Sequence, residues 1–390
     1  MFLFRGVWQR SERRLLVRLG WLALALPVLV VAAAFLLDPA LLEARYSRRE
    51  FTLQERLLTQ GRVLWHYVWW WLVPDITAMG FYHDDIAVSR GLWSPPGTAI
   101  GLAGWAFAVI ASLLLRRRYV VPAFAVIFYL VAHSLESSIW PLEMVYEHRN
   151  YLPSMALALL VAVALVRLSD YISWWRPAVA GAVVTLALLA TLALRAGAWS
   201  DETRLAQFNV INHPDSPRAN FHYGLVLHKT LEKSWDTQLT EEQRGAYAIA
   251  MRKYFLRMYE LDPRDMAAPV MLYQIDNSFF RRLPDRPDWL EILDQQVINR
   301  PIQSSDRTAL GALVNHAANA DIPQADKDRV RLLLEALSRR FPGRPYLYAL
   351  RHQLMLADER VGRERQLALL LEGIEARPGA TELYPYVVRH

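Results

Sequence analysis

The segment Gly97–Arg118, GTAIGLAGWAFAVIASLLLRRR, decides the fold class of this 390-residue chain. Its first 19 residues, 97–115, carry no charge, and a helix of that length crosses the hydrocarbon core of a bilayer, which is about 30 Å thick. Three arginines follow in a very short loop, and arginines in short loops favour the cytoplasmic side. The segment therefore predicts a transmembrane helix that ends in the cytoplasm.

Apolar segments on both sides of this one predict a membrane domain over residues 19–196. The expected spans, about five in number, are 19–37, 97–115, 119–135, 151–166 and 177–194. A basic tail, 1–18, precedes the first; a cleaved signal peptide is the alternative there, although no small-x-small site ends the run. Alternation then places the N-terminus in the cytoplasm and the C-terminal half on the opposite side of the membrane.

An aromatic segment, Val63–Pro74, is harder to place. It carries Trp65, Trp69, Trp70 and Trp71, residues typical of the headgroup zone, but its 12 residues are too few to cross. If it did cross, the three arginines at 116–118 would become external. We therefore expect an interfacial or re-entrant helix near 51–74, in an external loop.

The half of the chain after Trp199 has apolar residues at helical spacing among charges, which predicts a soluble α-helical domain over 197–390. Two Pro-Gly pairs, at 342–343 and 378–379, recur after 36 residues, a period close to that of helical-hairpin repeats. The segment Arg218–Leu225 resembles the first helix of a tetratricopeptide repeat, with Gly224 where two helices approach closely. An insertion near 231–245 interrupts the period, so a generic helical bundle is the alternative.

Composition narrows the possible functions. The formal net charge of +6 comes mainly from arginines beside apolar segments, rather than from a basic patch with aromatics, so no nucleic-acid partner is expected. The absence of cysteine excludes disulfides and thiolate metal sites. No phosphate-binding loop, zinc-protease motif or Ser-His-Asp signature is present, and no cofactor is predicted.

A polar cluster before the fourth expected span is the strongest candidate site. It consists of Glu147, His148, Arg149, Asn150 and Tyr151, at an external membrane boundary where such residues have no role in apolar packing. Arg149 could hold a phosphate with two parallel hydrogen bonds, while Glu147 orients it or accepts a proton. Alternatively, Glu147 and Arg149 pair with each other and cap the next span.

Secondary candidates lie in the preceding loops. His83, Asp84 and Asp85, followed by Arg90, could bind a divalent cation or act as acid and base. Neighbouring carboxylates in a loop are usually solvated or cap a helix, so no metal site is predicted. His133 and Glu136 are costly in lipid unless paired, so we expect them to point into the bundle and to line the same cavity.

Three stretches together resemble bacterial membrane proteins with C-terminal tetratricopeptide repeats: Phe51–Gln60, His83–Asp85 and Glu147–Pro153. Those proteins look related to the transmembrane and tetratricopeptide-repeat O-mannosyltransferases, of the lipid-donor glycosyltransferase superfamily. The resemblance implies a location in the inner (plasma) membrane of a bacterium. It also implies transfer of a sugar from a polyprenyl-phosphate carrier at the outer face, with Arg149 on the carrier phosphate and the repeats engaging a protein acceptor or partner.

Enzymes of that family carry an acidic pair in an early external loop, which supplies the catalytic base. No such segment precedes Asp38 here, so the chain is expected to correspond to the C-terminal part of a glycosyltransferase-like protein. The alternative function is a scaffold without catalysis, whose membrane half anchors a repeat domain that binds partner proteins of the cell envelope.

Overall fold

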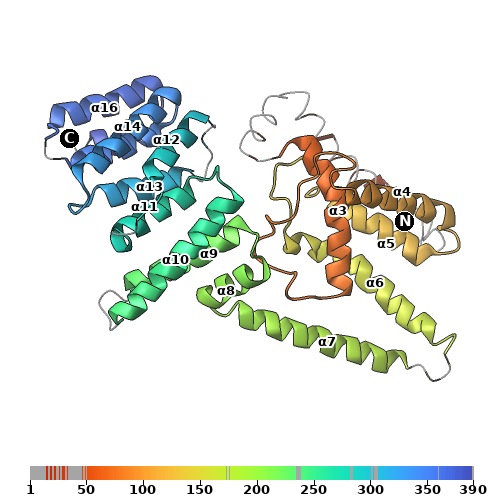
Figure 1. Cartoon of the computed structure of the whole chain (residues 1–390). Helices are drawn as coiled ribbons and strands as arrows, with labels where there is room; N and C mark the ends of the chain where they lie inside the picture. Colours follow the sequence, from red (N-terminus) through yellow and green to blue (C-terminus); the bar gives the residue numbers. More distant parts are fainter. Residues whose placement is uncertain are drawn as a thin grey trace. The chain divides into compact units, whose positions relative to one another are not determined.

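The computed structural model describes residues 51–388 except 173, 175, 234–238, 282–283, 300–301, 303–305 and 359, together with ten scattered residues before 51. Most of the expected basic tail and of the span 19–37 lies outside the described residues. Within them the chain is all-α, with fifteen α-helices, α3–α17, one 3₁₀ turn and no strand (Figure 1). The all-α fold class is confirmed for this part of the chain.

The chain divides into two compact units, Met1–His213 and Pro214–His390. We expected the soluble domain to begin at residue 197. The structure instead groups α8, Glu202–Asn212, with the first unit. The difference matters because α8 packs on α7 and contributes side chains to the first unit's loops.

The aromatic segment lies in the helix that was expected near residues 51–74. Helix α3 spans Leu53–Leu72 and begins with a capping box, in which Thr52 accepts from the Glu55 N–H and Glu55 accepts from the Thr52 N–H. It packs on α4, Gly97–Leu115. The two backbones approach so closely that a Cβ on Gly101 would lie 2.9 Å from the carbonyl oxygen of α3 at position 61.

Three described helices are long and apolar enough to cross a membrane. They are α4, the turn η1 (Glu147–Asn150) together with α6 (Tyr151–Leu168), and α7 (Pro177–Ala198). Helix α5, Val120–His133, has 14 residues, shorter than the expected span 119–135. At 1.5 Å per residue it is about 21 Å long, less than the hydrocarbon core.

Helix α7 differs from the others in its packing. None of its residues is buried, although α4, α5 and α6 each have some. An apolar helix that buries no side chain in its own chain leaves its surface for lipid or for other apolar helices.

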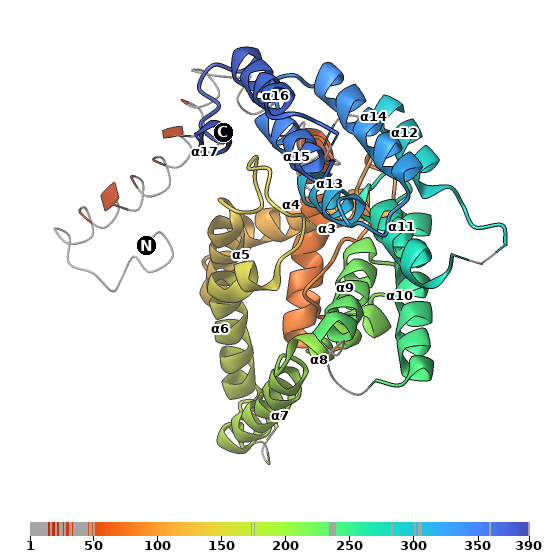
Figure 2. The ribbon, with the colours of Figure 1, turned by 90° about the vertical axis from the view of Figure 1, so that its left-hand side faces the viewer.

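The second unit is a succession of helices (Figures 1 and 2). In order they are α9 (Pro217–Lys233), α10 (Glu241–Leu261), α11 (Ala267–Phe279), α12 (Trp289–Asn299), α13 (Asp306–Ala317), α14 (Gln324–Arg340), α15 (Pro345–Leu356), α16 (Arg363–Ala376) and α17 (Tyr384–Val387). Each of α9 to α16 packs on its successor or on the helix after that, and α11, α13 and α15 contact one another in turn.

This succession has a regular spacing. Helices α11, α13 and α15 begin at 267, 306 and 345, which are 39 residues apart in both steps. The two Pro-Gly pairs follow α14 and α16, so both end the second helix of a pair. The expected close approach at Gly224 is confirmed, because a Cβ there would lie 2.8 Å from the Phe255 ring.

Candidate functional site

A cavity of about 420 Å³ lies in the first unit where several helices end. The last turns of α3, the first turns of η1 and α6, and the last turn of α7 surround it. The loop 79–81 closes one side. Its lining is Tyr67, Trp70, Trp71, Met79, Gly80, Phe81, Tyr146, Glu147, His148, Asn150, Tyr151, Ser154, Arg195 and Trp199. The walls are therefore mainly aromatic, with a few polar groups among them, as in many sites for small molecules.

The charged groups of the cavity form an ion pair. Arg195 Nη1, at the end of α7, lies 2.7 Å from Glu147 Oε2, at the start of η1, and both side chains are about four-fifths buried. Arg195 makes two polar contacts with other described residues, to Glu147 and to the Met79 sulfur. Both contacts use Nη1. Because a guanidinium has five N–H donors, Nε and Nη2 remain able to donate to a ligand.

The turn that carries Glu147 is fixed from behind by Tyr67. The Tyr67 hydroxyl donates to the Tyr146 carbonyl (2.9 Å) and accepts from the Tyr146 N–H (2.8 Å). Asn150 Nδ2 donates to the Tyr67 carbonyl, and Asn150 Oδ1 lies 3.3 Å from His133 Nε2. With its side chains locked by such contacts, the wall of the cavity is preorganised.

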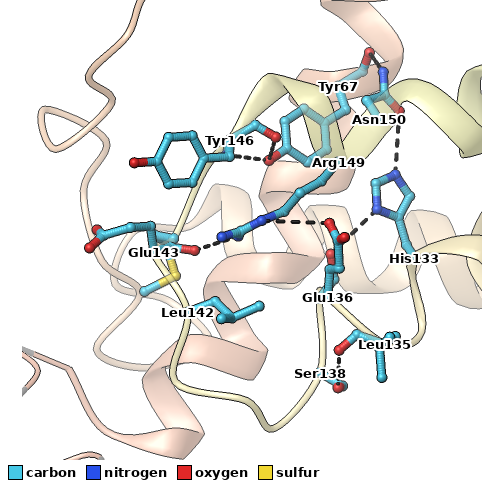
Figure 3. A network of polar contacts seen from close by, with 12 residues as sticks. Tyr67, His133, Leu135, Glu136, Ser138, Leu142, Glu143, Tyr146, Arg149 and Asn150 are labelled. Atoms are coloured by element: carbon cyan, nitrogen blue, oxygen red, sulfur yellow. Dashed lines mark hydrogen bonds and ion pairs between the residues drawn. The ribbon is translucent and has the colours of Figure 1, made fainter. Parts of the chain in front are cut away.

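Arg149 lies behind this wall and is not among the residues that line the cavity (Figure 3). Only 7% of its side chain is exposed. It donates to the Glu143 carbonyl (2.6 Å), approaches Glu136 Oε2 (3.6 Å) and lies over the Tyr146 ring. In this arrangement Arg149 supports the loop before η1, while Arg195 is the arginine that faces the cavity.

Of the other boundary candidates, Glu147, His148, Asn150 and Tyr151 do line the cavity. His133 points into the protein, since it is 1% exposed and stacks on Tyr67, whereas 41% of the Glu136 side chain is exposed. Neither is among the described residues lining the cavity. His133 contacts Asn150 and Glu136 contacts Arg149 instead, so both support the turn η1 from the side away from the cavity.

The candidate residues of the loop 83–90 lie in different surroundings. His83 is buried, stacked on Trp70, with Nε2 3.4 Å from Glu147 Oε1. Asp84 is exposed, and Arg90 lies at the other end of α3, where it pairs with Glu55.

Asp85 accepts a hydrogen bond from His213, the residue that caps α8 (2.8 Å). Burial raises the pKa of Asp85, but the His213 hydrogen bond and the nearby imidazoles outweigh burial and hold that pKa below its ordinary value.

Two residues that sequence reasoning did not single out are central to the loops around the site. Arg56 is fully buried and donates to the carbonyls of Glu136, Ser138 and Leu142, which fixes the loop before η1. Arg195 was assigned only to the end of a span. Its position was itself a signal, because an arginine at the end of an apolar helix of membrane length is costly unless it has a partner there.

Comparisons of the chain with protein-family models, with curated proteins and with solved structures found no match. The resemblance to lipid-donor glycosyltransferases therefore depends on the residues of this sequence alone.

Proposed function

We propose that this chain is a membrane protein of the glycosyltransferase type that binds a polyprenyl-phosphate-linked sugar in the aromatic cavity. The carrying observation is a partly buried arginine, Arg195, in an aromatic cavity at the ends of two helices of membrane length. A lipid-linked sugar presents an anionic phosphodiester at the membrane boundary, between an apolar chain and a polar sugar. The cavity offers matching surfaces for each part.

In this proposal, Arg195 binds the phosphate. Its Nε and Nη2 donate to two phosphate oxygens, while Glu147 holds Nη1 and so fixes the plane of the guanidinium. His148, an exposed residue of the lining, supplies a further donor. The volume of about 420 Å³ falls in the usual range for small-ligand pockets and accommodates one sugar with its phosphate.

The proposal includes the membrane topology. The turn Arg116–Arg118 follows α4, and α5 and α6 then run back and forth, so the cavity lies at the opposite ends of these helices from the three arginines. The positive-inside rule then places Arg116–Arg118 in the cytoplasm and the cavity and the second unit outside. Alkaline phosphatase fused after His390 is expected to be active. A fused fluorescent protein that folds only in the cytosol would, if bright, contradict this topology.

The test of donor binding uses full-length protein in detergent and a fluorescent polyprenyl-phosphate mannose. Arg195→Gln removes charge-assisted hydrogen bonds worth about 1.5–3 kcal/mol, so we expect binding to weaken roughly 10- to 150-fold. Arg204→Gln is the control, because Arg204 is 69% exposed and pairs with Asp201 at the surface. Wild-type protein that binds the unphosphorylated polyprenol equally well, or an unchanged Kd in Arg195→Gln, would refute the proposal.

The same assay distinguishes the two arginines. If Arg149 held the phosphate, as the resemblance implies, Arg149→Gln would lose affinity and Arg195→Gln would keep it. The geometry favours the opposite result, in which Arg195→Gln loses affinity for the donor. Arg149→Gln is expected to change binding only by destabilising the loop. Thermal unfolding of both variants, measured without ligand, separates a loss of fold from a loss of contact.

A scaffold without catalysis is the second candidate, favoured by the regular spacing of α11, α13 and α15 in the second unit. Stacked helix pairs expose extended surfaces that repeat proteins use to bind other proteins. Full-length protein and a chain ending at His213 would be purified from the same membranes and their co-purifying proteins quantified. A partner in stoichiometric amount with the full-length chain alone is expected; identical profiles would contradict the scaffold.

A further inference from the structure

A second group of polar side chains lies next to the cavity and does not take part in the proposed binding of donor. His83 and Asp85 come from the loop after α3, and His213 comes from the end of α8, 128 residues after Asp85. One possible ligand atom from each of the three lies within 4.8 Å of the other two. Among the residues that the structure describes, this is the one such group of histidines and carboxylates.

The two imidazoles have unsatisfied nitrogens. Both ring nitrogens of His83, and Nε2 of His213, are buried without a hydrogen-bond partner among the described residues, although His83 Nε2 lies 3.4 Å from Glu147 Oε1. The side chains are 2% and 7% exposed. An unsatisfied buried polar atom costs about 1–3 kcal/mol, so three within one small cluster indicate that the protein holds something there.

The cluster is built rather than accidental. Phe81 N–H donates to Asn209 Oδ1 (2.8 Å), which ties the loop to α8 beside His213. Trp70 stacks on the His83 ring (5.1 Å) and fixes its plane. Gly80 leaves room for the imidazole of His213, since a Cβ at position 80 would lie 2.8 Å from Nε2. The potential ligands are therefore held in place by groups around them.

We propose that His83, Asp85 and His213 bind one divalent transition-metal ion, of which zinc is the best match. Two imidazoles and one carboxylate favour such an ion over Mg²⁺ or Ca²⁺, which prefer oxygen ligands. Zn–N bonds of about 2.0–2.1 Å place tetrahedral ligands about 3.3 Å apart, so the three side chains must move inward by no more than about 1.5 Å.

The fourth position has a candidate in Glu147, whose Oε1 is 3.4 Å from His83 Nε2 and also lacks a hydrogen-bond partner among the described residues. Water is the alternative ligand there. In either case the ion joins the loop after α3 to His213, the residue that caps α8. This role is independent of whether the cavity binds a lipid-linked sugar.

The test is metal binding by full-length protein in detergent, stripped with a chelator and titrated with Zn²⁺ against a competing chromophoric chelator. We expect one ion per chain, a rise in the unfolding temperature with zinc, and no comparable effect of Mg²⁺ or Ca²⁺. His83→Gln and His213→Gln should each weaken zinc binding by more than roughly 100-fold, the upper end of what changes outside the ligand set cost. His228→Gln is the matched control, a histidine of the second unit paired with Glu232.

A ligand variant could lose zinc through misfolding, so Co²⁺ in wild-type protein supplies a second measurement. Tetrahedral Co²⁺ gives intense visible absorption bands, and zinc should displace them at one equivalent. Absence of zinc binding in wild type, equal affinity in wild type and both ligand variants, or octahedral Co²⁺ bands would each overturn the proposal. Donor binding by the same samples is measured separately, so failure of one proposal is distinguishable from failure of the other.

Discussion

Replacing Arg56 by Met should open the loop 134–146 without changing the helices around it. The fully buried guanidinium donates to the carbonyls of Glu136 (2.7 Å), Ser138 (3.0 Å) and Leu142 (2.6 Å). A fourth contact, to the Glu143 carbonyl, is long at 3.3 Å, and Arg149 also donates to that oxygen. The substitution therefore leaves three acceptors without their donor.

The cost follows from these three groups. Each buried acceptor that loses its partner costs about 1–3 kcal/mol, and these carbonyls are only partly buried, so the lower end applies. We expect local opening of the loop to become easier by roughly 3–4 kcal/mol. That difference corresponds to amide hydrogen exchange about 150- to 800-fold faster in the loop.

The assay is hydrogen exchange on full-length protein in detergent, followed at the Tyr146 amide, which is bonded to the Tyr67 hydroxyl. Since Glu147 is the next residue, donor binding should fall in parallel. Arg90→Met is the matched control, because Arg90 is 57% exposed and its surface pair with Glu55 is worth less than about 1 kcal/mol. Exchange in Arg56→Met within tenfold of wild type would refute the assignment of Arg56 as the anchor of the loop.

Three further predictions concern packing and charge. Gly101→Ala should destabilise the first unit by about 1–3 kcal/mol in thermal unfolding, because its Cβ would lie 2.9 Å from an α3 carbonyl oxygen that cannot move away easily. Gly224→Ala should lower the stability of the second unit by a similar amount, through contact with the Phe255 ring. Burial raises the pKa of Asp288, but hydrogen bonds from Arg329 and from the Glu291 and Leu290 N–H groups, together with the charge of Arg329, outweigh burial and hold that pKa below its ordinary value. The stability that Asp288 adds is then complete above its unfolded pKa of about 3.9 and is lost as the pH falls through the lower folded pKa. The free energies of unfolding of wild type and Asp288→Asn, measured in urea, should therefore converge as the pH falls from 7 to 3.

The glycine controls lie in the same unit as the residue that they match, and the control for Asp288 lies in the same ion pair. Gly181→Ala and Gly245→Ala add a Cβ that meets nothing within 4 Å, so neither should destabilise the protein, and Gly245→Ala should stabilise α10 by up to about 1 kcal/mol. Asparagine also caps helices, so Asp288→Asn changes charge more than hydrogen bonding at the start of α12. Arg329→Gln should show the same convergence at low pH; a difference from wild type that stays constant from pH 7 to pH 3 in both variants would contradict the assigned pair.

The apolar helices could be predicted from sequence because their signal is local. Helix α4 covers 97–115 as expected, and α6 and α7 begin at the expected residues 151 and 177. Helix α3, Leu53–Leu72, lies within the helix expected near 51–74, although Glu55, Arg56 and Arg62 interrupt the apolar run in its first half. The pattern Thr52-x-x-Glu55 was a usable signal for its start, since such pairs form capping boxes.

Only part of the site could be predicted from the sequence, because its other residues are brought together by contacts between segments distant in sequence. A run of polar residues at a helix boundary identifies Glu147 and His148, yet nothing local distinguishes the inward Arg195 from the buried Arg149. Likewise Asp85 looks like a solvated loop carboxylate until His213 is brought beside it. Glu147 connects the two groups, with one oxygen on Arg195 and the other near His83. A substitution of Glu147 is therefore expected to affect both donor binding and metal binding, whereas Arg195→Gln should affect the first and leave the second.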